Sequence, residues 1–160
     1  MKRSQKGFSL IELLIVVAII LIIAAIAIPN LLRARMQANE ASAVSSIHAI
    51  NTAELSYFST FPAVGYAASL ANLGDGGSSP CPGTSAASCY LDAVLVSGTK
   101  SGYTFSYTAD TSTTPSLHYT VNANPVASGT SGQRNFYSSD LNVTRFNGSA
   151  TATSTDAPLQ

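Results

Sequence analysis

The stretch FSLIELLIVVAIILIIAAIAI, residues 8–28, decides the fold of this chain. Of its 21 residues, 15 are Leu, Ile, Val or Phe and four are Ala, so only Ser9 and Glu12 are polar. A helix of this length rises about 31 Å, which matches the roughly 30 Å hydrocarbon core of a bilayer. The stretch therefore predicts a helix that spans a membrane.

Three basic residues, Lys2, Arg3 and Lys6, precede the apolar stretch. Basic residues beside a span favour the cytoplasmic side, so we expect a single pass of a membrane with a cytoplasmic N-terminus. A removed secretory signal is a weaker interpretation, because its apolar part is shorter and ends in small residues. A plain, uncleaved anchor stays open as the alternative.

Glu12 is the feature that a plain anchor does not explain. A carboxylate within a span costs about 3 kcal/mol, whereas each large apolar residue returns about 0.3 to 0.6 kcal/mol, so insertion survives. Glu12 lies about one helical turn from Phe8. It is either hydrated near the headgroups or pairs with a positive group in an apolar assembly, since a buried charge is tolerated when it is paired.

The sequence KGFSLIELLIVVAII at residues 6–20, followed by AAIAIP at residues 24–29, resembles the N-terminus of a type IV prepilin. The resemblance implies that a leader, residues 1–7, is removed by cleavage between Gly7 and Phe8. It also implies that Phe8 becomes an N-methylated amino terminus and that the helix after it is retained.

The same resemblance implies a role for Glu12, which is to pair with the amine of a neighbouring subunit during assembly. The implied partners are other copies of this chain in a helical filament, a prepilin peptidase that is also the methyltransferase, and an inner-membrane assembly platform with its ATPase. The implied function is that of a structural subunit of a type IV pilus, stored in the inner membrane and then part of an extracellular filament.

Two other functions stay open at this point. One is a pseudopilin of a type II secretion system, which forms a periplasmic pseudopilus. The other is a membrane-anchored periplasmic binding module, in which the helix is only a tether.

Residues 29–61 are expected to continue the helix, because no Gly or Pro occurs from Leu31 to Phe58. Pro29 removes a backbone hydrogen bond and crowds the preceding turn, so it predicts a kink. Many prepilins have Gly where this chain has Leu21, which leaves Pro29 as the one obvious weak point in the helix.

The continuing helix has two faces at about 100° per residue. A large apolar face should pack against a sheet; it holds Met36, Ala43, Val44, Ile47, Ile50, Tyr57 and Phe58. A face of small residues lies on the other side; it holds Ala34, Ala38, Ala41, Ser45, Ala49 and Thr52. The small face either allows close helix packing in a filament core or reflects the helix propensity of Ala. Glu40 and Glu54 fall near the centre of the large face, without an evident reason, and His48 is expected to be solvated or hydrogen-bonded.

Residues 62–160 predict an irregular loop, an antiparallel sheet and a Ser/Thr-rich tail. Gly and Pro clusters mark the loop. Strands are predicted at residues 90–96, 103–108 and 117–123, and a hairpin at residues 135–139 and 143–146. The predicted fold class is therefore α+β, with a long N-terminal transmembrane helix continuing across a small antiparallel sheet, as in pilins. The tail from Gly148 onward has little to bury, so we expect it to be mobile or glycan-bearing.

Cys81 and Cys89 lie in the part expected outside the inner membrane, with seven residues between them. A disulfide is preferred there over a metal site, since no His or further Cys is near. Asp140-x-Asn142-x-Thr144 has oxygen ligands at alternating positions for calcium, but it lacks the full loop pattern, and a plain turn is preferred.

Composition disfavours two function classes. Eight basic and eight acidic side chains leave no net charge, so a nucleic-acid partner is not expected. The chain has two isolated His residues, no nucleophile elbow and no phosphate-binding loop, so neither an enzyme nor a cofactor or metal site is expected.

Overall fold

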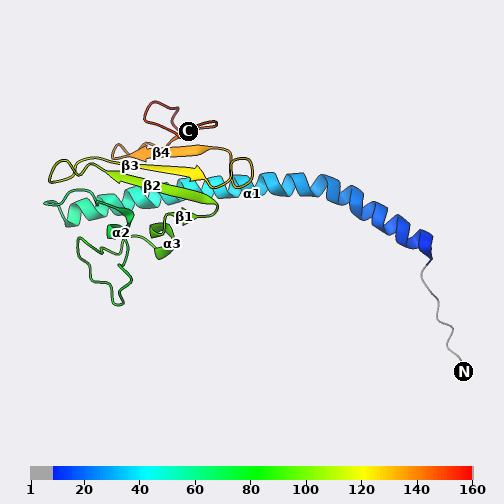
Figure 1. Cartoon of the computed structure of the whole chain (residues 1–160), viewed down its shortest axis with the longest axis horizontal. Coiled ribbons are helices and arrows are strands. Elements are labelled where there is room, and N and C mark those ends of the chain that lie inside the picture. The colour runs from blue at the N-terminus through cyan, green and yellow to red at the C-terminus, as the bar shows by residue number, and fades with distance from the viewer. Residues whose placement is uncertain (1–8, 160) are drawn as a thin grey trace, which may run out of the picture. The chain divides into compact units, whose positions relative to one another are not determined.

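The computed structural model describes residues 9–159 (Figure 1). The elements in chain order are α1 Leu10–Thr60, α2 Leu70–Leu73, α3 Ala93–Val96, β1 Thr99–Lys100, β2 Tyr103–Ala109, β3 Tyr119–Pro125, β4 Asn135–Ser139 and β5 Arg145–Asn147. The chain forms two compact units that divide between Arg35 and Met36. The predicted α+β class, a long apolar N-terminal helix with a small antiparallel sheet, is confirmed.

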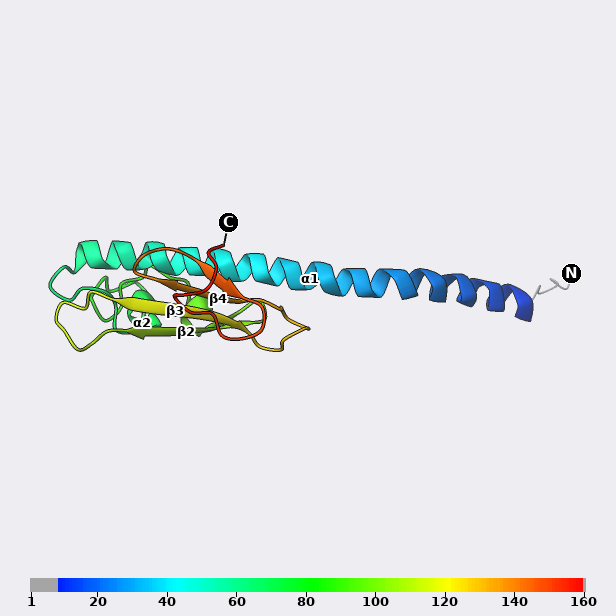
Figure 2. The ribbon, with the colours of Figure 1, turned by 90° about the horizontal axis from the view of Figure 1, so that it is seen from above.

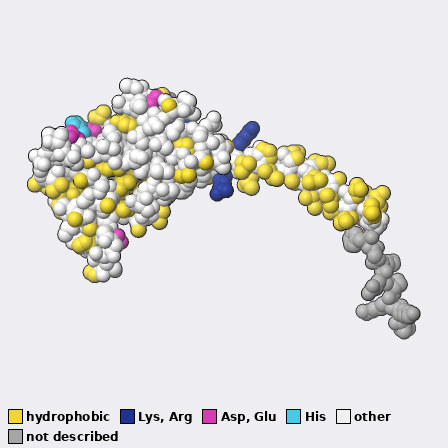
Figure 3. All heavy atoms as spheres, viewed as in Figure 1, with side chains coloured by type: hydrophobic (Ala, Val, Ile, Leu, Met, Phe, Trp, Pro, Cys, Tyr) yellow, Lys and Arg dark blue, Asp and Glu magenta, His cyan; other side chains and the backbone are white. Residues whose placement is uncertain are grey.

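The first unit holds the apolar half of α1. This part of the helix is long and apolar enough to cross a membrane, and none of its most apolar stretch is buried within the chain. Figure 3 shows hydrophobic side chains all along it. Pro29 lies inside α1, and helix is assigned on both sides of it. A kink at Pro29 stays a prediction.

The second unit is built on a sheet in which the strands follow one another in the order β1-β2-β3-β4-β5. Strands β2 and β3 pair antiparallel along their whole length, from Tyr103 opposite Pro125 to Ala109 opposite Tyr119. Strands β4 and β5 form the predicted hairpin. Strand β3 begins at Tyr119 and β5 at Arg145, two residues later than predicted in each case.

The core of the second unit lies between the C-terminal half of α1 and one face of the sheet (Figure 2). The predicted large face of the helix is confirmed: Ala43, Ile47, Ile50 and Tyr57 are buried, and Met36, Val44 and Phe58 are partly buried. The sheet contributes Tyr103, Phe105, Val121, Ala123 and Phe136, and the short helices contribute Leu70, Leu73 and Leu95. The apolar face of the strands, which repeats every two residues, therefore packs against the apolar face of the helix, which repeats every 3.6 residues.

A buried polar contact fixes the helix on the sheet. Asn51 donates from Nδ2 to the Ser138 hydroxyl at 2.9 Å, and its Oδ1 accepts from the Tyr119 hydroxyl at 2.9 Å. Because these groups have no solvent to replace a lost partner, a slip of the helix along the sheet would leave them unsatisfied.

The predicted strand at residues 90–96 is wrong, because its second half is α3. The Asp92 side chain accepts a hydrogen bond from the backbone N–H of Leu95 at 3.2 Å, which caps the helix start. Gly98 then adopts a φ of 78° and turns the chain into β1. This local capping overrides the β preference of the Val residues.

The C-terminal tail packs against the sheet, so the prediction of a mobile tail is wrong. Ala152 is 2% exposed, and its carbonyl accepts from Asn122 Nδ2 at 2.8 Å. The N–H of Leu159 donates to the Thr144 carbonyl at 2.8 Å, and that of Phe146 donates to the Ala157 carbonyl at 3.1 Å. Backbone pairing holds this segment together with limited apolar burial, at Ala152 and at Leu159, which packs against the core. Composition alone does not predict backbone pairing of this kind.

Candidate assembly site

The predicted processing residues, Gly7 and Phe8, lie outside the described residues. Cleavage between them and N-methylation of Phe8 therefore stay predictions. The described residues begin at Ser9, one residue before α1.

Glu12 caps the start of α1. Its Oε2 accepts a hydrogen bond from the backbone N–H of Ser9 at 2.9 Å. The Ser9 carbonyl accepts the N–H of Leu13 at 3.2 Å, the first bond of the helix. A carboxylate at this place satisfies one of the free N–H groups and complements the positive end of the helix dipole. Glu12 is exposed, and among residues 9–159 its Oε1 accepts no hydrogen bond, so this oxygen can receive a further partner.

The face of small residues is uncovered. All six of its members, from Ala34 to Thr52, are exposed. Side-chain hydroxyls near the end of the helix bond to carbonyls four residues earlier; they belong to Thr52, Ser56, Ser59 and Thr60. Of these residues, Thr52 belongs to the small face, and its hydroxyl proton is satisfied within α1, so a second helix can approach it without stranding that donor. His48 is also exposed, as expected.

Glu40 anchors α1 to the turn between β3 and β4. Its Oε1 accepts from the backbone N–H groups of Gln133 at 2.9 Å and Arg134 at 3.2 Å, and its Oε2 accepts from Arg134 Nε at 2.7 Å. Burial opposes ionisation, but these hydrogen bonds and the guanidinium charge hold the pKa of Glu40 below its ordinary value. The Arg134 guanidinium also lies over the rings of Phe136 and Phe146.

Glu54 anchors the other end of the helix and is fully buried. Its Oε2 accepts from the N–H of Ala67 at 3.0 Å. The Tyr107 hydroxyl donates to the Ala67 carbonyl at 2.7 Å and lies beside the Glu54 carboxyl. Burial raises the pKa of Glu54 to about 7, against the lowering effects of Tyr107 and the Ala67 N–H. The sequence signal for both anchors is an acid at the centre of an apolar helix face, which requires a buried partner.

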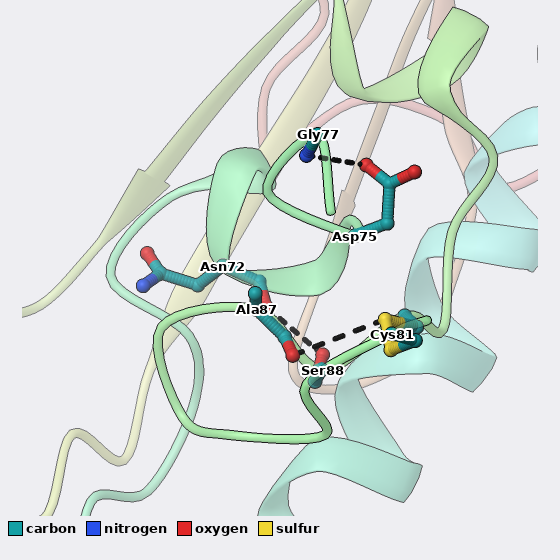
Figure 4. Close-up of a disulfide and its surroundings, with 7 residues drawn as sticks. Asn72, Asp75, Gly77, Cys81, Ala87 and Ser88 are labelled. Carbon is teal, nitrogen blue, oxygen red and sulfur yellow. Dashed lines mark hydrogen bonds between the residues drawn. A yellow bond between two sulfur atoms is a disulfide. The ribbon is translucent and has the colours of Figure 1, made fainter. Parts of the chain in front are cut away.

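Cys81 and Cys89 form the predicted disulfide (Figure 4). The loop between them is attached to the core at Ser85, whose carbonyl accepts from the Tyr57 hydroxyl at 2.7 Å and from Asn72 Nδ2 at 3.2 Å. The backbone N–H of Cys89 donates to the Gly74 carbonyl at 2.9 Å. The disulfide thus closes a loop that also packs against the end of α1.

Removing the disulfide with Cys81→Ser and Cys89→Ser together is expected to lower the free energy of unfolding by about 2 to 3 kcal/mol, because the short loop no longer restricts the unfolded chain. Chemical unfolding of the full chain in detergent, followed by tyrosine circular dichroism, measures the change. Reductant should destabilise the unmutated chain and leave the double variant unaffected. Equal stability of the two chains under oxidising conditions would contradict this prediction.

The segment Asp140-x-Asn142-x-Thr144 is a candidate for calcium, with a plain turn as the preferred interpretation. The structure has a turn at Asp140 and Leu141. Asp140 Oδ2 lies 3.0 Å from His118 Nδ1, and the N–H of Asn142 donates to the Ser139 carbonyl at 2.8 Å. Within residues 9–159, no group of three or more His, Cys, Asp or Glu side chains is placed to hold a metal ion.

Comparison with known proteins finds similarity in the N-terminal part of the chain, which contains the residues of this candidate site. Residues 2–28 match the family described as the prokaryotic N-terminal methylation motif. The type IV wide pilus major component PilA4 of Thermus thermophilus is 68% identical over 38 residues, which cover 24% of this chain and 29% of that protein. The type IV major pilin protein PilA of Myxococcus xanthus is 50% identical over 55 residues, 34% of this chain and 25% of that protein.

A secretion protein matches over a similar length. The type II secretion system core protein G of Aeromonas hydrophila is 40% identical over 52 residues, which cover 32% of this chain and 36% of that protein. The matched part thus spans about a quarter to a third of these relatives' length. No solved structure matches the chain significantly.

The methylation motif and the uncovered apolar helix are features in which this chain is similar to pilin-type proteins. Over this N-terminal part, the matched relatives are major pilins of type IV pili and a core protein of a type II secretion system.

Proposed function

We propose that this chain is a structural subunit of a type IV pilus, processed between Gly7 and Phe8 and assembled through α1. The observation that carries the proposal is a methylation motif on an apolar helix that the chain's own core leaves uncovered. Its partners would be other copies of itself, the prepilin peptidase and methyltransferase, and an inner-membrane platform with its ATPase. It would have a structural rather than a catalytic role.

The uncovered helix supports two successive locations. The exposed apolar surface of this helix is unfavourable in water, and a contiguous surface of this kind marks a contact with a membrane or a protein. The bilayer covers it while the subunit is stored in the inner membrane, and the helices of neighbouring subunits cover it in the extracellular filament. The small face suits the second location because its short side chains let helix backbones approach closely there.

Glu12 supports the filament step in particular. A bilayer leaves its carboxylate near the headgroups, but a core of packed helices removes water from it, so a positive partner is required. Cleavage at Gly7 would create that partner, the amine of Phe8 on a neighbouring subunit. The free oxygen of Glu12 can receive the amine while the other oxygen keeps its bond to Ser9.

The second candidate is a pseudopilin of a type II secretion system, which the match to core protein G favours. Both candidates predict the same processing, but they differ in the location of the polymer, which is outside the cell for the pilus and in the periplasm for the pseudopilus. Shearing cells and finding the protein in long surface fibres would support the pilus. A polymer confined to the periplasm would support the pseudopilus.

Mass spectrometry of the protein from its native membrane tests processing. We expect a chain that starts at Phe8 and carries one added methyl group on its amine. A Gly7→Ala variant serves as the control, because a larger residue beside the scissile bond should leave the leader in place. A native chain that starts at Met1 would refute the proposal and support a simple membrane-anchored binding module.

A further inference from the structure

Arg33 and Arg35 follow the apolar stretch of α1 and are both exposed. Ion pairs among the described residues involve other groups: Lys100 with Asp92, His118 with Asp140, and Arg134 with Glu40. Residues two apart on a helix point about 200° apart. Figure 3 shows basic side chains on two sides of the helix where its apolar run ends. Both guanidinium groups are therefore open to an anion from outside the described residues of the first unit.

The depth of these groups in a membrane follows from helix geometry. Arg33 lies five residues and Arg35 seven residues after Ile28, the last residue of the apolar stretch. At ~1.5 Å per residue they stand about 7 to 11 Å beyond the hydrocarbon, while the headgroup layer is about 5 to 7 Å thick. Helical side chains lean toward the N-terminus, and a long Arg stem reaches back further, so both groups come to the level of the lipid phosphates.

We propose that Arg33 and Arg35 bind the phosphate groups of phospholipids at the outer face of the inner membrane. The inference rests on the proposed membrane-stored state of the subunit. Guanidinium is suited to this contact because it binds phosphate through two parallel hydrogen bonds and is weakly hydrated. Contacts on opposite sides of one helix would fix its depth and restrict its tilt.

The proposed cleavage changes the balance of charge across the span. Before it, Lys2, Arg3 and Lys6 lie on the cytoplasmic side and two Arg residues lie on the outer side. Afterwards the cytoplasmic end keeps one amine, and the outer end keeps both guanidinium groups. The electrostatic attachment of the stored subunit is then carried mainly by its outer end, at the phosphates that it must leave when it enters a filament.

Solid-state NMR of carbon–phosphorus proximity tests the contact. The full chain, labelled at the arginine Cζ carbon, is placed in phosphatidylglycerol and phosphatidylethanolamine vesicles in phosphate-free buffer. Arg3→Lys in every sample removes the leader's label, so four labelled residues remain: Arg33, Arg35, Arg134 and Arg145. We expect lipid phosphorus to attenuate about half of the Cζ signal in this background, since two of the four residues contact phosphate.

Two variants decide the outcome. Arg33→Lys with Arg35→Lys replaces the labelled groups by unlabelled ones, so the attenuation should disappear, whereas Arg145→Lys should retain it. No attenuation in the parent chain, or attenuation that persists in the double variant, would overturn the proposal. The vesicles contain no peptidase and form no filament, so failure of the proposed pilus function would leave this result unchanged.

Discussion

Replacing Glu12 with Leu is expected to abolish filaments while leaving the subunit in the membrane. Insertion should survive, because an apolar side chain replaces one that costs about 3 kcal/mol in a span. Assembly should fail, because the Phe8 amine of the neighbouring subunit would be left unpaired among packed helices. Breaking a buried pair costs about 3 to 5 kcal/mol, which is a factor of at least about 100 for each contact.

Glu12→Gln separates charge from helix capping. The Gln side chain retains an oxygen that can accept the N–H of Ser9, as Glu12 does at 2.9 Å, but carries no charge. We expect this variant to fail in assembly as the Leu variant does, whereas Asp75→Asn, which removes an exposed acid from the second unit, should form normal filaments. The amounts of sheared filament and membrane-inserted subunit are the two measurements. Normal filaments from Glu12→Gln would show that the carboxylate acts only as a cap.

Raising the pH from about 4.5 to about 7 is expected to destabilise the second unit through Glu54. Its pKa is raised from 4.5 to about 7 in the folded chain, so the folded state binds more protons than the unfolded state between these values. The stabilisation due to Glu54 is fully present below about pH 4.5 and is lost as the pH rises through about 7. The loss amounts to about 3 kcal/mol, because each pKa unit corresponds to about 1.4 kcal/mol.

Glu54→Gln should remove this pH dependence. The amide retains an acceptor for the N–H of Ala67 and stays neutral, so the variant should unfold at a higher temperature than the parent above pH 7 and at a similar temperature near pH 4. Glu40→Gln is the matched control on the same helix face. Because the pKa of Glu40 is lowered by Arg134 and backbone N–H groups, this control should be less stable than the parent at pH 7. Thermal unfolding in detergent across this pH range gives the measurement. A loss of stability between about pH 4.5 and pH 7 that is as large in Glu54→Gln as in the parent would contradict the prediction.

The parts of the fold that could be predicted are those in which one periodic pattern extends over many residues. The helix faces were predictable because burial repeats every three to four residues from Ala43 to Tyr57. The long strands β2 and β3 were predictable from alternation. The processing residues Gly7 and Phe8 and the assembly role of Glu12 depended on the resemblance of the N-terminal segment, and all three stay predictions.

The parts that could not be predicted depend on contacts between distant residues. Helix α3 forms because one Asp side chain caps it, which a run of Ala, Val and Leu does not reveal. The anchors at Glu40 and Glu54 depend on backbone N–H groups of Gln133 and Ala67, and every residue type except Pro provides such groups. The C-terminal tail is held in the same way, mainly by its backbone. Local propensity carries little information about pairings of this kind.

The docked tail has a consequence for how copies of this protein behave when they are crowded. An open strand edge invites another chain to extend the sheet, and a crowded membrane store would favour irreversible fibres of that kind. Here the segment from Ala157 to Leu159 occupies the last edge, and the opposite border is a strand of only two residues. Growth by sheet extension is thereby discouraged, so the polymer proposed above would form through its apolar helices rather than through its sheet edges.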